Sequence, residues 1–168
     1  TLGIVPYPLA ESKGIESWMT EYLINSGGPP TNLDIDTGWV GAMQTAQSIN
    51  GCMNANMSAY IWWYIVRYYG PISDGTYETK GNVTNKGYVM SQYSRFVRPG
   101  FFRVDATQNP QSGVYLSAYK DTSGIVIVVI NNSSSQKNQT FLLEGGSVPT
   151  FSRYVSSQIK KCVQETAF

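Results

Sequence analysis

The sequence predicts two regions of different fold class: an α/β region over residues 1–99 and a β region over residues 100–168. In the first region, two apolar strand-like runs are each followed by a polar loop and by apolar residues at helical spacing. In the second, turn residues separate short β-like runs. Strands that alternate with helices form parallel sheets, whereas strands joined directly by turns form antiparallel sheets or sandwiches.

The α/β region begins with a loop over residues 1–16, with room for a short helical turn, and continues as a strand over residues 15–22. A breaker-rich loop follows over residues 25–30. Asp36 and Thr37 are then expected to cap a helix. Its apolar side chains recur at helical spacing: Val40, Met43, Ala46, Ile49 and Met53.

Residues 59–66 form the second predicted strand, and this run is apolar on both faces. Such a run is typical of a strand that is covered on both sides, as in parallel α/β sheets. A polar loop then leads to a second helix, which is expected to end near Pro99 and Gly100. The helix is marked by Val89, Met90, Tyr93 and Phe96. Because two parallel strands leave unpaired edges on both sides, we expect this region to be a piece of a larger sheet.

The β region contains short runs of β-forming residues that Asn, Pro, Ser and Gly turns separate. The runs cover residues 101–105, 114–119, 125–130, 140–143 and 151–155. They predict a small antiparallel sheet or half-sandwich. The tail from Lys160 to Phe168 shows no clear last strand.

Composition excludes several classes of function. Charged residues make up 14% of the chain and the net charge is +1, which argues against nucleic acid as the main partner. The absence of histidine excludes Ser-His-Asp triads and histidine metal sites, and we expect neither metal nor cofactor. No apolar run approaches the roughly 18 residues of a membrane span. Cys52 and Cys162 either form a disulfide or remain free buried thiols.

Glu21 is the strongest candidate for catalysis. It stands where the first strand gives way to loop, and residues at the carboxyl ends of parallel strands face the active site in α/β barrels. Without histidine, carboxylate chemistry is the natural remaining option, and glycoside hydrolysis is its main example. A solvated glutamate at the edge of a loop is the alternative.

The stretch from Tyr60 to Pro71 combines aromatic rings with an arginine. Aromatic rings offer flat apolar faces to sugars, and a guanidinium offers carboxylates a planar fork, so the mixture suits an acidic carbohydrate. If the extended conformation persists past residue 66, Trp63, Arg67 and Tyr69 lie on one side of the strand. Core packing explains Trp62 better.

Arg67 also has a plainer interpretation, in which it pairs with a structural carboxylate. Asp34 and Asp36 are the candidate partners for such a pair. Asp36 is explained as well by a role at the start of the helix, where a carboxylate is favoured.

Together these stretches resemble the glucuronoxylan-specific endoxylanases of glycoside hydrolase family 30. Trp18-Met19-Thr20-Glu21 is similar to the family's nucleophile strand, and residues 59–65 are similar to its eighth barrel strand. Other similar stretches are residues 6–9, 86–90, 96–100, 104–107 and 114–120. The resemblance implies the C-terminal part of a (β/α)8 TIM barrel over residues 1–99, with strands seven and eight. A partial antiparallel β-sandwich side domain is implied over residues 100–168.

The resemblance also implies a function: endo-acting, retaining hydrolysis of β-1,4-xylan in glucuronoxylan, with recognition of the methylglucuronate branch. Glu21 would be the catalytic nucleophile. Arg67 and Tyr69 fall where the family holds the branch. The full set of implied substrate-binding residues is Trp63, Tyr64, Arg67, Tyr69 and Ser26.

Two departures from the family pattern stand out. Leu23 takes the place of a tyrosine, so Tyr22 or Ser26 would have to replace its hydrogen bond to the branch sugar. Nothing in the chain corresponds to the family's acid/base glutamate, so we expect the chain alone to be inactive or nearly so.

Alternatives remain open at this point. They are a non-catalytic xylan-binding module, a structural β-domain without ligand, and a related family 30 hydrolase that acts on another β-glycan. For the complete enzyme we expect a secreted, extracellular monomer that acts on xylan or glucuronoxylan, with no nucleic-acid or membrane partner.

Overall fold

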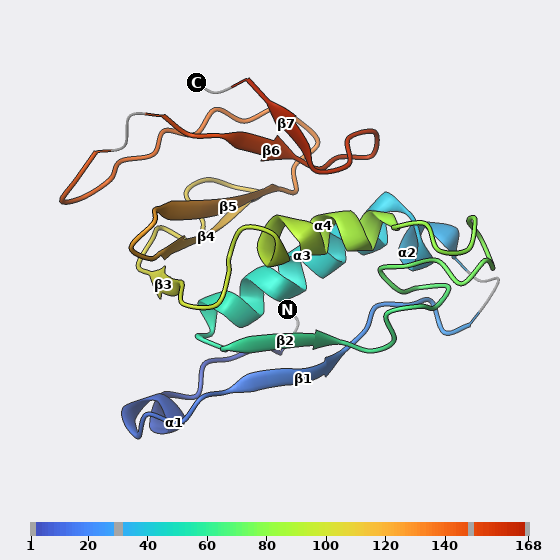
Figure 1. Ribbon diagram of the computed structural model, residues 1–168, viewed down its shortest axis with the longest axis horizontal. Coiled ribbons are helices and arrows are strands. Elements are labelled where there is room, and N and C mark those ends of the chain that lie inside the picture. Colours follow the sequence, from blue (N-terminus) through green and yellow to red (C-terminus); the bar gives the residue numbers. More distant parts are fainter. Residues whose placement is uncertain (1–2, 29–31, 148–149, 167–168) are drawn as a thin grey trace.

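The computed structural model describes residues 3–28, 32–147 and 150–166. Its elements form layers (Figure 1): a pair of parallel strands, a layer of two helices, an antiparallel sheet and a two-stranded hairpin. Within the described part of the chain, no helix is both long and apolar enough to cross a membrane.

The parallel pair consists of β1 (Trp18–Tyr22) and β2 (Ala59–Trp62), with the helix α3 (Trp39–Asn54) between them in sequence. This is the β–loop–α–β order predicted from the sequence. Both strands are shorter than predicted: β1 begins three residues later, and β2 ends before Trp63. The second strand is also not covered on both faces, because Ile61 is 46% exposed.

The region before α3 differs from the prediction. A short helix α1 (Pro8–Ser12) precedes β1, and a four-residue helix α2 (Leu33–Asp36) precedes α3. Asp36 therefore ends α2 and does not cap α3, whose N-cap is Gly38. The side chain of Asp36 is fully buried and accepts hydrogen bonds from another loop, which explains why it is unavailable as a cap. The breaker-rich loop predicted over residues 25–30 lies partly outside the described residues.

The second helix, α4 (Asn85–Ser94), is capped by Thr84, whose hydroxyl accepts a hydrogen bond from the Gly87 N–H. That bond satisfies one of the free donors of a helix N-terminus. The helix ends at Ser94 and not near Pro99 and Gly100, because residues 95–100 leave the helix through turns.

The antiparallel sheet contains three strands in sequence order: β3 (Phe102–Val104), β4 (Val114–Lys120) and β5 (Ile125–Asn131). Continuous pairing of β4 with β5 confirms the antiparallel sheet predicted for the runs over residues 114–119 and 125–130. The hairpin of β6 (Arg153–Val155) and β7 (Val163–Glu165) completes the β region.

Two predictions about the β region are wrong. Residues 140–143 form no strand, and Leu142 is 88% exposed. The tail, in contrast, does contain a strand, because β7 pairs with β6 and Glu165 forms ion pairs with Arg153 and Lys160. Both errors have one cause: whether a short run becomes a strand depends on a distant partner for its backbone.

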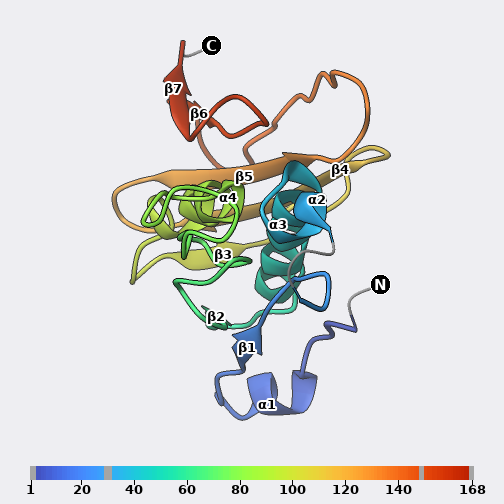
Figure 2. The ribbon, with the colours of Figure 1, turned by 90° about the vertical axis from the view of Figure 1, so that its right-hand side faces the viewer.

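The helix layer holds the molecule together, because its two faces pack against different sheets. Figure 2 shows α3 and α4 side by side between the parallel pair and the antiparallel sheet. One buried cluster joins Ile49 of α3 and Tyr93 of α4 to Tyr119 and Val128 of the antiparallel sheet. Tyr60 of β2 packs against the same cluster, so the parallel pair and the sheet share one core.

Both cysteines are free, so the disulfide alternative is wrong. Cys52 is fully buried in α3, and burial raises the pKa of its thiol to about 11. Cys162 is partly exposed in the β6–β7 hairpin.

We expect these thiols to react at very different rates with an aromatic disulfide reagent. Cys162 is accessible and should react within minutes at pH 8, whereas Cys52 is buried with a raised pKa and should react only after the chain unfolds, because the thiolate is the reactive form. The measurement is the number of thiols titrated before and after adding denaturant, with one expected before and two after. Two fast thiols in the folded chain would contradict this assignment.

Candidate functional site

The carboxyl ends of β1 and β2 lie side by side and point toward the end of the molecule that carries α2 (Figure 1). The Trp63 N–H donates a 2.8 Å hydrogen bond to the Tyr22 carbonyl, which joins the two strand ends. We call residues 23–28 the first loop and residues 63–72 the second loop. The site predicted from the sequence is divided between the end of β1 and these two loops.

Glu21 lies at an irregularity of the strand pair. Met19 pairs with Tyr60 and Tyr22 pairs with Trp62, so two residues of β1 stand opposite one residue of β2. Such a β-bulge bends a strand and re-aims side chains, and bulges are common beside active sites. Here the bulge contains Glu21, whose side chain is exposed.

The second loop leaves the extended conformation at Tyr64, which has a φ of 59°. This left-handed conformation is uncommon outside glycine and costs free energy that the surrounding contacts must offset. The loop then folds on itself: the Ile72 N–H bonds to the Ile65 carbonyl at 3.0 Å. A Cβ on Gly70 would lie 2.7 Å from the Ile65 carbonyl oxygen, so only glycine fits there.

This turn contradicts the argument that placed Trp63, Arg67 and Tyr69 on one face by alternation. Trp63 and Arg67 are exposed, whereas Tyr69 is only 5% exposed. Trp62 is buried in the core, as predicted.

Arg67 lies against an aromatic surface. Its guanidinium stands over the Tyr64 ring at 5.4 Å, and the Tyr64 ring meets the Trp63 ring edge to face at 4.8 Å. A cation held over a ring keeps its N–H donors free for other partners. The structure gives Arg67 no ion-pair partner among residues 3–28, 32–147 and 150–166.

The electrostatics of Tyr69 connect the predicted residues. Burial raises the pKa of the Tyr69 hydroxyl, the positive charge of Arg67 lowers it, and the negative charge of Glu21 raises it. The charges of Glu21, in β1, and of Arg67, in the second loop, shift this pKa in opposite directions, and Glu21 has the weaker influence of the two. The bulge and the second loop bring Glu21, Arg67 and Tyr69 into one neighbourhood.

The positive charge of Arg67 acts on the carboxylate of Asp74, and within the described residues Arg67 forms no ion pair with Asp34 or Asp36. Burial would raise the pKa of Asp74, but hydrogen bonds from Thr76 and the positive charge of Arg67 outweigh burial and lower it. Asp74 lies in the polar loop after β2, where sequence spacing gives no hint of its proximity to Arg67.

Ser26 lies in the first loop and its hydroxyl is already in use. Its N–H and its Oγ each donate a 2.8 Å hydrogen bond to the carboxylate of Asp36, and Oγ accepts one from Asn32. The structure thus places Ser26 beside the site and anchors the first loop to α2 through it. A contact between Ser26 and a substrate stays a prediction.

Sequence reasoning missed Lys86, which is fully buried beneath the two loops. Lysine is almost never fully buried unless it is paired, so no local sequence signal indicates such a position.

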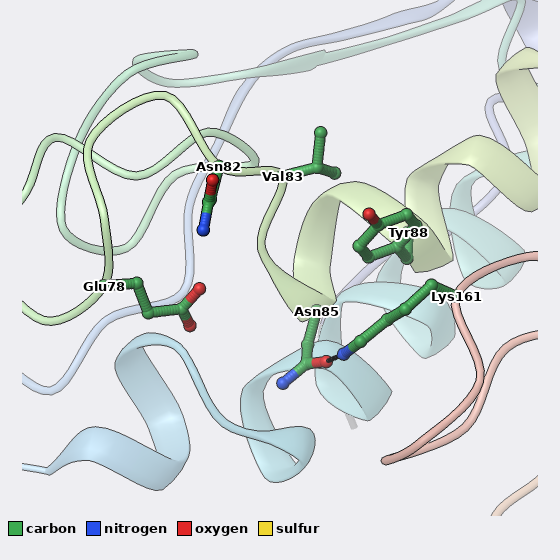
Figure 3. Close-up of a pocket in the computed structure, with 6 residues that line it drawn as sticks. All are labelled: Glu78, Asn82, Val83, Asn85, Tyr88 and Lys161. Carbon is green, nitrogen blue, oxygen red and sulfur yellow. Dashed lines mark hydrogen bonds between the residues drawn. The ribbon is translucent and has the colours of Figure 1, made fainter.

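The hollow of about 360 Å³ shown in Figure 3 lies elsewhere, between the start of α4 and the β6–β7 hairpin. Lys161 reaches across it to the amide oxygen of Asn85 and stands over the Tyr88 ring. The other lining residues are Glu78, Asn82 and Val83. None of the predicted site residues lines this hollow. We place the site at the strand ends, because charged and aromatic groups converge there.

No family model matches the chain. The chain is, however, 41% identical over 155 residues to the glucuronoxylanase XynC of Bacillus subtilis (strain 168), a match that covers 90% of this chain. A second Bacillus subtilis glucuronoxylanase XynC is 42% identical over 156 residues. The resemblance to glycoside hydrolase family 30 xylanases is confirmed. The chain spans only 35% and 34% of the length of these two relatives.

Solved structures agree on the fold. A family 30 subfamily 8 xylanase from Clostridium acetobutylicum superposes with a TM-score of 0.81 at 36% identity, covering 96% of this chain and 39% of that one. A family 30 endoxylanase from Clostridium papyrosolvens superposes with a TM-score of 0.79 at 32% identity, again covering 96% of this chain and 39% of that one. An endo-β1,6-glucanase at 21% identity and a TM-score of 0.58 shows likeness of fold alone. The predicted fold class, the C-terminal part of a (β/α)8 barrel with a β-rich side domain, is confirmed.

Proposed function

We propose that this chain contributes the nucleophile strand and the branch-recognition loop of a retaining endo-β-1,4-xylanase that hydrolyses glucuronoxylan. The observation that carries the proposal is that Glu21, at the bulge of β1, and the second loop, which carries Arg67, lie at the adjacent carboxyl ends of two parallel strands. Relatives that carry the name glucuronoxylanase support the choice of substrate.

In the proposed reaction, a carboxylate oxygen of Glu21 bonds to the anomeric carbon of a backbone xylose. The bond from that carbon to the leaving oxygen breaks, and an acid residue protonates the leaving oxygen. Water, deprotonated by the same residue, then cleaves the glycosyl ester with overall retention. Retaining enzymes hold their two carboxyls about 5–5.5 Å apart. We place the acid/base residue outside this chain, so the chain alone should not hydrolyse xylan.

Arg67 is proposed to bind the carboxylate of the methylglucuronate branch. A guanidinium can form two parallel charge-assisted hydrogen bonds with a carboxylate, and such bonds are roughly twice as strong as bonds between neutral groups. Tyr69 is proposed to assist at the same branch. The exposed rings of Trp63 and Tyr64 are proposed to pack against the apolar faces of the sugars. The secreted location and the monomeric state stay predictions.

Activity can be tested in a hybrid enzyme, in which this chain replaces the matching 35% of the Bacillus subtilis glucuronoxylanase. In the hybrid enzyme, Arg67→Ala should lower kcat/KM for glucuronoxylan about 10- to 100-fold. This factor corresponds to the free energy that hydrogen bonds to a charged group contribute. Hydrolysis of unbranched xylan should change little, because the branch is absent. The measurement is reducing-sugar release from the two substrates.

The matched control is Arg98→Ala, because Arg98 is also exposed and donates a side-chain hydrogen bond to the carbonyl of Ser94, the last residue of α4. This control should leave both activities unchanged. An equal loss on branched and unbranched xylan for Arg67→Ala would reject the recognition role.

A further inference from the structure

Lys86 is the largest fully buried side chain among the described residues. It occupies the first turn of α4 and points away from solvent. Burial of a charged ammonium costs several kcal/mol, roughly, unless other groups satisfy it. The contacts of the Lys86 ammonium therefore indicate its role in the structure.

The ammonium of Lys86 donates hydrogen bonds to two backbone carbonyls. One is the carbonyl of Ile24, in the first loop, and the other is the carbonyl of Tyr69, in the second loop, at 3.3 Å. Ile24 comes three residues after Glu21, and Tyr69 comes two residues after Arg67. A single side chain thus joins the segment that carries the proposed nucleophile to the segment that carries the proposed branch-binding arginine.

The residues around Lys86 leave space for its side chain and stabilise its charge. A Cβ on Gly41 would lie 2.9 Å from the Lys86 Cε, so α3 lacks a side chain where the lysine passes. The ammonium also stands 5.5 Å from the centre of the Trp62 ring, a favourable contact for a desolvated cation. Burial lowers the pKa of Lys86 to about 8, and the negative charge of Asp36 opposes that shift. At neutral pH the side chain therefore remains largely a cation.

Asp36, the last residue of α2, holds the first loop as well. Its carboxylate holds the N–H and the hydroxyl of Ser26, two residues after Ile24. The first loop is thus fixed by a cation at Ile24 and by an anion at Ser26. The second loop is fixed by the same cation at Tyr69.

We propose that Lys86 is a positioning residue that sets the distance between Glu21 and Arg67 by clamping the two loops to each other. This inference rests on the proposed function, since it concerns the alignment of the same site. The Lys86 ammonium donates to backbone carbonyls of both loops and forms no ion pair within the described residues, so its contacts join the two loops. Misplacement of reacting groups by about 1 Å can cost about 100-fold in rate.

The first test is kinetic and uses Lys86→Met in the hybrid enzyme, because methionine keeps the apolar stem and removes the ammonium. We expect kcat on glucuronoxylan to fall about 10- to 100-fold while KM changes about threefold or less, because alignment and not binding is lost. The control is Lys80→Met, which removes an exposed lysine from the connection that leads to α4. A kcat within about twofold of the parent at a temperature where both are folded would overturn the proposal.

The second test does not need activity. In the 168-residue chain, hydrogen exchange should become faster in residues 23–28 and 63–72 together when Lys86 is replaced by Met, and stay unchanged in β4 and β5. Faster exchange throughout the chain would show a general loss of stability and overturn the clamp. If the parent hybrid enzyme lacks activity while the two loops loosen together, the proposed function fails and the clamp stands.

Discussion

Replacement of Glu21 by glutamine in the hybrid enzyme should lower the hydrolysis of glucuronoxylan by about 10,000-fold or more, because an amide cannot form the glycosyl ester. Glutamine has nearly the shape of glutamate, and the side chain is exposed at a β-bulge, so the fold should be kept. The measurement is the rate of reducing-sugar release, with circular dichroism to show that the variant is folded.

The matched control is Glu16→Gln. Glu16 is an exposed glutamate just before β1 whose carboxylate accepts a hydrogen bond from the Trp18 indole, and its replacement should leave the rate unchanged. A mechanism-based fluorinated xyloside should label a peptide that contains Glu21 in the unmodified hybrid enzyme. Label on a different carboxylate, or activity retained by Glu21→Gln, would refute the nucleophile assignment.

The position of Glu21 could be predicted from the sequence because it depends on local information. An apolar run that gives way to polar residues marks the end of a strand, and parallel strands bring such ends to one edge. The same reasoning placed Trp62 in the core and predicted the antiparallel sheet that contains β4 and β5. In each case the hydrophobic pattern within a few residues decided the structure.

The geometry of the loops could not be predicted, because it depends on contacts between distant residues. The left-handed Tyr64 follows the end of β2, and the loop that follows is held by the bond from the Ile72 N–H to the Ile65 carbonyl and by Lys86. Asp36 looked like a helix cap by its spacing, yet it binds Ser26, ten residues earlier. Buried charges of this kind follow no periodicity, so the pattern of apolar residues does not indicate them.

The other large effect is expected for Gly41→Ala, which should destabilise the chain by about 3 kcal/mol or more. A Cβ at this position in α3 would lie 1.9 Å from the Ile35 carbonyl oxygen and 2.8 Å from the Ile35 carbonyl carbon. Both atoms belong to the backbone of α2 and cannot rotate away, so one of the helices must move. Because the Lys86 Cε lies 2.9 Å from the same point, the movement would also displace the clamp beneath the loops. The measurement is the midpoint of urea unfolding of the 168-residue chain, followed by circular dichroism.

Gly51→Ala supplies the control, since it is the same substitution in the same helix with the opposite expected sign. A Cβ on Gly51 would meet only the side chain of Ile4, at 3.4 Å, which is ordinary contact with a group that can move. Alanine is the better helix former by about 0.5–1 kcal/mol, so the unfolding midpoint should rise. If helix propensity alone decided stability, both substitutions would stabilise the chain. If α3 packs closely on α2, Gly51→Ala should stabilise the chain and Gly41→Ala should destabilise it. Equal shifts of the two midpoints would therefore refute the tight contact between α2 and α3.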